Sequence, residues 1–106
     1  MTAEDLRKLA EIAGLIEFAG PEKFQRHYRT KTRDSIFCLS HEWKPHLHID
    51  QAMMVAEAFY SYEINKYETD AAKYFCKIFG RVVGQAIGVE LPYTICRAAL
   101  AAKEVE

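Results

Sequence analysis

The sequence predicts a protein of the α+β class: a single-domain α/β/α sandwich in which helices cover a small antiparallel sheet of about three strands. Apolar residues recur at helical spacing from Ile49 to Phe59, and the period then changes to an alternation from Tyr60 to Tyr67. The chain has 106 residues, 50% of them hydrophobic, which is enough to bury one core. We therefore expect one domain over residues 1–106.

The first residues predict a helix over residues 3–18. Thr2 and Asp5 have the spacing of a capping box, in which side chain and backbone bond each other at the start of a helix. The apolar residues that follow repeat at helical spacing: Leu6, Leu9, Ala10, Ala13 and Ile16. Gly20 and Pro21 are expected to end the helix, because glycine accepts the left-handed conformation and proline cannot continue the hydrogen-bond ladder.

The helix from Ile49 to Phe59 is the element around which the remainder is expected to pack. Its apolar stripe consists of Ile49, Ala52, Met53, Ala56, Phe59 and Tyr60. No glycine or proline separates it from the next segment, where Tyr60, Tyr62 and Ile64 alternate with polar residues. The pattern predicts a helix that leads almost directly into a strand and crosses the sheet that this strand joins.

The run of residues 35–39 and the segment from Lys73 to Phe79 indicate further strands. Cys76 and Ile78 lie on one face of the second segment, and Phe75 and Phe79 on the other, so we expect helices on both sides of the sheet. The segment 80–88 has a glycine at every fourth position but matches neither a dinucleotide fingerprint nor a phosphate loop. It is interpreted as a flexible connection or an edge strand.

A last helix is expected to begin near Pro92, because proline suits the first helical turn. The predicted core collects the apolar positions of all these elements: Leu6, Leu9, Ala13, Ile16, Met53, Ala56, Phe59, Ile64, Cys76, Ile78, Ile95, Ala99 and Leu100. Cys76 and Cys96 fall on core faces, where a thiol behaves as a small hydrophobe.

The totals exclude several classes of partner. A net charge of −1 and a pI near 6.4 give no global attraction to long nucleic acids or anionic membranes. No apolar run approaches the roughly 18 residues of a membrane span, and no signal-peptide pattern begins the chain. Three cysteines with no close pair indicate a reducing compartment. We therefore expect a cytoplasmic protein with no membrane partner.

The only concentrated positive charge lies between Lys23 and Asp34, where cations are interleaved with aromatic residues. One interpretation is a solvated connection whose cations balance the acidic helices. The other is an anion site, since arginine forks and aromatic faces together suit phosphates and nucleobases. The second interpretation assigns phosphate binding to Arg26, Arg29, Lys31 and Arg33 and stacking to Tyr28 and Trp43.

Histidines are concentrated between His41 and His48, and His46 and His48 are secondary polar candidates for the same ligand. Cys38, His41, His46 and His48 also suggest zinc, because thiolate and imidazole are its preferred ligands. Their spacing matches no familiar finger pattern, and His41-Glu42 with His46 misses the zinc-peptidase motif by one residue. We therefore expect surface or capping histidines, no metal, no cofactor and no catalytic residue, and hence no enzyme.

Three short motifs carry a resemblance to a known family: Trp43-Lys44-Pro45, Ile49-Asp50-Gln51-Ala52 with Val55 and Glu57, and Ile95-Cys96-Arg97-Ala98-Ala99-Leu100. Over about residues 43–102 the chain resembles the phage ABA-sandwich domain family. The resemblance implies a phage or prophage origin, and hence a bacterial host cell, together with a layered fold. It carries no catalytic residues.

Two functional hypotheses follow. The first is a non-enzymatic phage protein that binds a small anionic ligand and sequesters a host nucleotide immune signal, as an anti-defence sponge. The alternative is a phage interaction module that docks on a host protein and inhibits it, with Trp43, Tyr60, Tyr62 and Tyr93 as aromatic anchors. In both cases we expect a homo-oligomer, by default a dimer, because the apolar load is large for a domain of this size.

Overall fold

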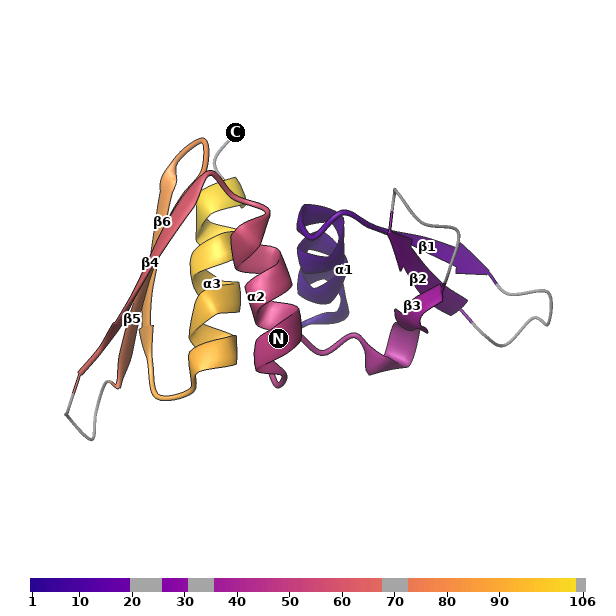
Figure 1. Cartoon of the computed structure of the whole chain (residues 1–106), viewed down its shortest axis with the longest axis horizontal. Helices are drawn as coiled ribbons and strands as arrows, with labels where there is room; N and C mark the ends of the chain where they lie inside the picture. The colour runs from indigo at the N-terminus through magenta and orange to yellow at the C-terminus, as the bar shows by residue number, and fades with distance from the viewer. Residues whose placement is uncertain (20–25, 31–35, 68–72, 105–106) are drawn as a thin grey trace.

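The structure of the chain, a computed structural model, describes residues 1–19, 26–30, 36–67 and 73–104 (Figure 1). Its elements, in chain order, are α1 (Ala3–Ile12), β1 (Leu15–Ala19), β2 (Arg26–Thr30), β3 (Ile36–Leu39), the 3-10 turn η1 (Ser40–Glu42), α2 (Ile49–Glu57), β4 (Ser61–Lys66), β5 (Tyr74–Phe79), β6 (Val83–Gly88) and α3 (Leu91–Glu104). Helices and antiparallel strands occur together, which confirms the predicted α+β class.

The strands form two antiparallel sheets of three strands each. The N-terminal sheet has the order β1-β2-β3, and the C-terminal sheet has the order β4-β5-β6. Figure 1 shows the layers along the long axis of the molecule: the C-terminal sheet, then α3 and α2, then α1, then the N-terminal sheet. The sequence predicted about three strands in one sheet. The C-terminal sheet contains the strands predicted after residue 60, whereas the strand predicted at residues 35–39 is β3 of a second, N-terminal sheet that the sequence does not predict.

Helix α3 covers the inner face of the C-terminal sheet and contacts β5 and β6. Cys76, Ile78 and Ala86 are buried against it. The approach is closest at Gly84, where an added Cβ would overlap the backbone of Ala98 and Ala102 on α3. Because only glycine lacks this atom, Gly84 sets how closely the helix lies on the sheet. The glycine-spaced segment is thus an edge strand, one of the two interpretations of its sequence.

The prediction of a helix over residues 3–18 is wrong beyond Ile12. The capping box at Thr2 and Asp5 begins α1 as expected, but Gly14 has φ +81°, the left-handed conformation that ends a helix. Residues 15–19 then pair with β2 as a strand. Ile16, predicted in the core, is 41% exposed, because strand geometry turns it away from the buried Leu15 beside it.

The remaining core prediction is confirmed in most positions. The buried members are Leu9, Ala56, Cys76, Ile78, Ile95, Ala99 and Leu100, and those partly buried against them are Leu6, Ala13, Met53, Phe59 and Ile64. Helix α2 leads into β4 across three residues, as the change of period predicted. Trp43 and Tyr28 belong to the same core, whereas the sequence predicts both as ligand-stacking residues.

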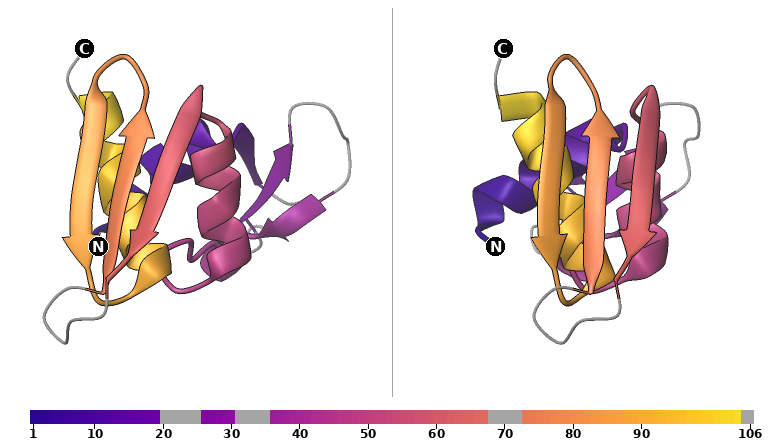
Figure 2. Two further views of the ribbon diagram at one scale, coloured as in Figure 1. Left: turned by 60° about the vertical axis from the view of Figure 1, so that its left-hand side comes forward. Right: turned by 90° about the vertical axis from the view of Figure 1, so that its left-hand side faces the viewer.

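One feature of the layering differs from expectation. Helices were expected on both faces of residues 73–79, but among the described residues α2 and α3 lie on a single face of the C-terminal sheet (Figure 2). Phe75 and Phe79 point to the other face and are partly exposed. Apolar residues on both faces of a central strand therefore do not by themselves require two layers of cover.

Within the described ranges, no helix has the length and apolar character needed to cross a membrane.

Candidate functional site

Strand β2 positions the described part of the predicted phosphate site. The Arg26 side chain is 69% exposed, and its Nη1 lies 3.4 Å from Glu17 Oε1 on the neighbouring strand β1. An exposed pair of this kind contributes little to stability and leaves the guanidinium accessible. Two further predicted phosphate ligands, Lys31 and Arg33, lie outside the described residues.

Arg29 makes contacts within the N-terminal sheet. Its Nε donates a hydrogen bond to His27 Nε2 at 2.9 Å, and its guanidinium carbon lies 5.0 Å from the centre of the Phe18 ring. The Phe18 and His27 rings are themselves stacked, with centroids 6.0 Å apart. His27 is 3% exposed, so the arginine satisfies a buried nitrogen. The cations and aromatic rings of this segment therefore contact one another on one face of the N-terminal sheet.

The two predicted stacking residues face the interior. Tyr28 and Trp43 are 5% and 2% exposed, and their ring centroids lie 6.1 Å apart. Trp43 Nε1 donates a hydrogen bond to the Leu6 carbonyl oxygen at 2.9 Å, which ties the segment before α2 to α1. These contacts join the N-terminal sheet to the helices. Neither ring presents an open face on which a nucleobase can stack.

The histidines that precede α2 are placed near its N-terminus. His48 is the N-cap residue, is exposed, and makes no capping hydrogen bond with its side chain. His46 is half-buried, and its Nδ1 is buried with no hydrogen-bond partner among the described residues. Burial lowers the pKa of His46, and the positive charges of the N-terminal ammonium, Lys44 and His48 lower it further. His46 therefore favours its neutral form.

A hollow of about 430 Å³ lies beside the start of α2. Its described lining residues are His41, Glu42, Lys44, His48, Asp50 and Gln51. Gln51 accepts a hydrogen bond from the Lys44 backbone nitrogen at 2.6 Å and donates one to the Glu42 carbonyl oxygen at 3.1 Å, so its amide fixes the segment around the hollow. The lining mixes cations and carboxylates. None of the described β2 side chains contributes to it, so the structure does not place Arg26 or Arg29 beside these histidines.

Among the described residues, no three His, Cys, Asp or Glu side chains lie close enough together to hold one metal ion. The structure does not describe the side chain of Cys38, one of the four residues that suggest zinc in the sequence. Cys76 and Cys96 are buried and free. Burial raises the pKa of Cys76 to about 11 and that of Cys96 to about 12, so both remain thiols and act as small core residues.

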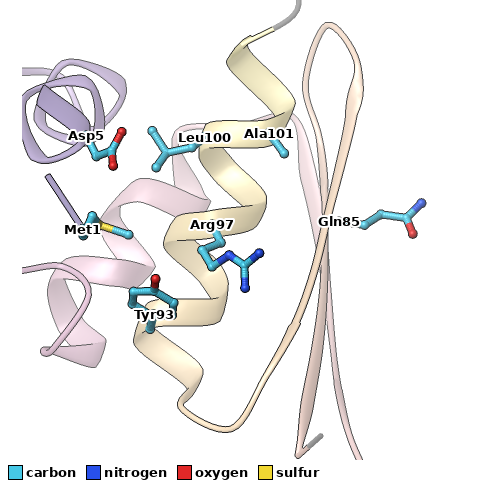
Figure 3. Close-up of a pocket in the computed structure, with 7 residues that line it drawn as sticks. All are labelled: Met1, Asp5, Gln85, Tyr93, Arg97, Leu100 and Ala101. Carbon is cyan, nitrogen blue, oxygen red and sulfur yellow. The ribbon is translucent and has the colours of Figure 1, made fainter.

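A second hollow, of about 330 Å³, opens between α1, α3 and β6 (Figure 3). Its described lining residues are Met1, Asp5, Gln85, Tyr93, Arg97, Leu100 and Ala101. Asp5 is already bonded within the capping box. Arg97 is exposed and has no hydrogen-bond or ion-pair partner among the described residues. The hollow therefore offers one available cation beside a strand edge.

The outer face of the C-terminal sheet, which we call the outer sheet face, is covered by none of the described helices or strands (Figure 2). The strand register arranges its side chains in cross-strand rows, namely Ser61, Phe79 and Val83; Glu63, Lys77 and Gln85; and Asn65, Phe75 and Ile87. Val83 is 48% and Ile87 55% exposed. Lys77 Nζ lies 5.3 Å from the centre of the Phe79 ring. Two rows rich in apolar side chains thus flank one polar row, and no described element covers them (Figure 2).

Sequence reasoning missed this surface because it treated Phe75 and Phe79 as evidence for a covering helix. Exposed aromatics also lie around the sheet: Tyr60, between α2 and β4, is 98% exposed, and Tyr67, beyond β4, is 48% exposed. Of the residues predicted as protein-binding anchors, Tyr60 and Tyr93 are exposed, Tyr62 is half-buried and Trp43 is buried. The signal available in the sequence was that Val83 and Ile87, two apolar residues, share one strand face with the polar Gln85.

Comparison with known proteins adds no identification. No protein-family model matches the chain, and neither a curated protein nor a solved structure matches it. The resemblance of residues 43–102 to the phage ABA-sandwich family therefore stays a prediction.

Proposed function

We propose that the chain is a protein-interaction module and that its docking surface is the outer sheet face. The observation that carries the proposal is the pair of uncovered apolar rows around Phe75 and Phe79. Open apolar surface with a polar row is the composition expected of a protein–protein interface, whose buried centre is rich in aromatic side chains. The phage resemblance makes a bacterial host protein the first partner to test, and inhibition of that protein the first effect to measure.

The size of the surface limits how the partner binds. Strands about 4.8 Å apart with residues rising about 3.3 Å each give this sheet of three strands a face of roughly 14 by 20 Å. A standard interface buries about 800 Å² on each partner, which is more than such a face provides. The partner is therefore expected to extend beyond the face onto the edge of the sheet.

The test combines capture with site-specific crosslinking. A photo-crosslinking amino acid replaces Lys77 at the centre of the outer sheet face, or Ile16 on the N-terminal sheet as the control position. In bacterial extract, we expect one stoichiometric host protein to crosslink at the Lys77 position and not at the Ile16 position. The double variant Phe75→Thr and Phe79→Thr should lose this partner, because threonine keeps strand propensity but removes the aromatic surface.

The matched control is Ile16→Thr, which removes an exposed apolar side chain from the other sheet. It should retain the partner in full. Circular dichroism and thermal unfolding of all variants show that loss of binding is not loss of fold. Equal capture by the wild type and the Phe75, Phe79 double variant, or crosslinking only at the Ile16 position, would contradict the proposal.

Binding of a small anionic ligand, such as a host nucleotide signal, is the second candidate function. It is supported by the accessible Arg26 guanidinium and by Lys44 and His48 beside the hollow at α2. We expect thermal stabilisation by a member of a panel of cyclic and ADP-ribose-type nucleotides, and recovery of that ligand unchanged after heat denaturation. Stabilisation that persists in both the Arg26→Ala and the Lys44→Ala variants, or none at all, would eliminate this candidate.

Self-association also remains a prediction. Sedimentation at micromolar concentration tests it directly, since a dimer has twice the 12.2 kDa mass of the chain. A single species of 12.2 kDa would contradict it.

A further inference from the structure

We propose that the edge of β6, which pairs with no further strand among the described residues, binds an extended segment of the partner protein, in which acidic and apolar residues alternate, as a fourth strand of the C-terminal sheet. The inference rests on the proposed function, because it names the chemistry of the same partner. It concerns the edge of the sheet rather than its outer face.

The two edges of this sheet differ in their protection against pairing. An edge strand presents unpaired backbone N–H and C=O groups, and proteins commonly protect such edges with charged side chains. Strand β4 carries Glu63 and Lys66. Strand β6 has the sequence VGQAIG and carries no charge along its whole length. Of the two edges, β6 is therefore the one that accepts another strand.

Backbone hydrogen bonds show which residues of β6 face this edge. Gly80 N donates to Val82 O, and Lys73 N donates to Gly88 O, so even-numbered residues bond within the hairpin of β5 and β6. The odd-numbered residues Val83, Gln85 and Ile87 consequently turn their N–H and C=O groups to the free edge. Their side chains lie on the outer sheet face.

Strand β6 packs closely against α3. An added Cβ on Gly84 would overlap α3 backbone, and one on Gly88 would overlap the Thr94 hydroxyl. The backbone of β6 therefore lies directly on the helix. A segment that pairs with β6 is expected to lie above the exposed side of α3, where the hollow of Figure 3 opens.

The hollow determines which side chains the segment needs. Side chains of a strand alternate between faces, so those of the added strand lie alternately beside Val83 and Ile87 and above Arg97. The first environment is apolar. The second contains an arginine without a partner among the described residues, and Arg97 can bind a carboxylate through two parallel hydrogen bonds. A segment in which valine-like and acidic residues alternate places apolar side chains beside Val83 and Ile87 and carboxylates above Arg97.

Two blocked peptides test the inference directly with the whole chain: one in which valine and glutamate alternate, and one in which valine and lysine alternate. We expect the wild-type protein to bind the glutamate peptide at least about tenfold more tightly, measured by fluorescence anisotropy, because the charge of Arg97 favours one and repels the other. Arg97→Glu should reverse the preference. Arg7→Glu, an exposed charge reversal on α1, should leave it unchanged.

A second pair of variants tests the strand edge. Gln85→Pro removes an N–H that faces the free edge, which an edge strand tolerates, and should abolish binding of the glutamate peptide. Lys66→Pro makes the same change at the β4 edge and should have no effect. Amide chemical shifts of the wild type should move at Val83, Gln85 and Ile87 on titration.

Equal binding of both peptides, an unchanged preference in Arg97→Glu, or shifts confined to β4 would overturn the inference. A host partner that is lost from the Phe75, Phe79 double variant but retained by Arg97→Glu and Gln85→Pro would overturn it while leaving the proposed function intact. Binding of the glutamate peptide at β6 without any partner on the outer sheet face would support the inference and contradict the proposed function.

Discussion

The two sheets of this protein treat their aromatic and charged residues in opposite ways. In the N-terminal sheet, Phe18, His27 and Arg29 bind one another, and Tyr28 packs on Trp43 in the core. In the C-terminal sheet, two apolar rows are left on an open face around Lys77. The N-terminal sheet, whose sequence interleaves cations and aromatics, therefore uses these described residues for packing. The C-terminal sheet, whose sequence has no such cluster, carries the open surface.

The largest effect is expected where the N-terminal sheet is joined to the helices. Trp43→Ala removes a fully buried ring and the hydrogen bond to the Leu6 carbonyl oxygen. We expect it to lower the free energy of unfolding by about 3–5 kcal/mol, as large-to-small core substitutions of this size do. Urea denaturation measures the change. A loss below about 1 kcal/mol would mean that Trp43 is not a core residue, and would restore it as a stacking platform.

The inner face of the C-terminal sheet supplies the next effect. Gly84→Val places a side chain against the backbone of α3 at Ala98 and Ala102 and is expected to cost about 3 kcal/mol. The neighbouring substitution Gln85→Val, whose side chain points to the outer sheet face, serves as control and should be nearly neutral. Thermal unfolding compares them. Equal melting temperatures would show that α3 does not lie on β6 as described.

Arginines of the N-terminal sheet give a smaller and more selective effect. Arg29→Ala removes the hydrogen bond to buried His27 and the contact with the Phe18 ring, and should destabilise the chain by about 1–2 kcal/mol. Arg26→Ala removes an exposed ion pair and should cost less than about 0.5 kcal/mol. Chemical denaturation of both variants decides the comparison. Equal, small effects would indicate that Arg29 is free to bind a ligand.

The smallest effect is the pH dependence of stability that arises from the buried Cys96 thiol on α3. Burial raises the pKa of Cys96 to about 12, above its value in the unfolded chain. The stabilisation is fully present below the unfolded pKa and is lost as pH rises from about 9 towards 12, because only the unfolded thiol ionises in that range. We expect Cys96→Ala to lose about 1 kcal/mol less stability than the wild type between pH 8 and pH 10. Identical pH profiles would show that Cys96 is accessible to water.

The sequence predicted the half of the fold that depends on local patterns. The change of period after Phe59 predicted α2 and β4, because helical and strand periodicities record which face is buried. It misplaced residues 15–18, where Leu15, Ile16 and Phe18 continue an apolar pattern that suits a helix as well as a strand. Only the left-handed Gly14 and pairing with β2 distinguish them, and pairing is a contact between distant residues.

The candidate site was predictable to a smaller extent. Interleaved cations and aromatics between Arg26 and Arg29 have the same sequence signature whether they bind phosphate or one another. In the structure Arg29 contacts His27 and Phe18, because the strand register places Phe18 beside His27, and Tyr28 packs beside Trp43 in the core. Sequence alone determined the α+β class, the central helix and most core positions. Layer packing decided the second sheet, as well as the outer face and the β6 edge that no described element covers, since what covers a face depends on residues far away in the chain.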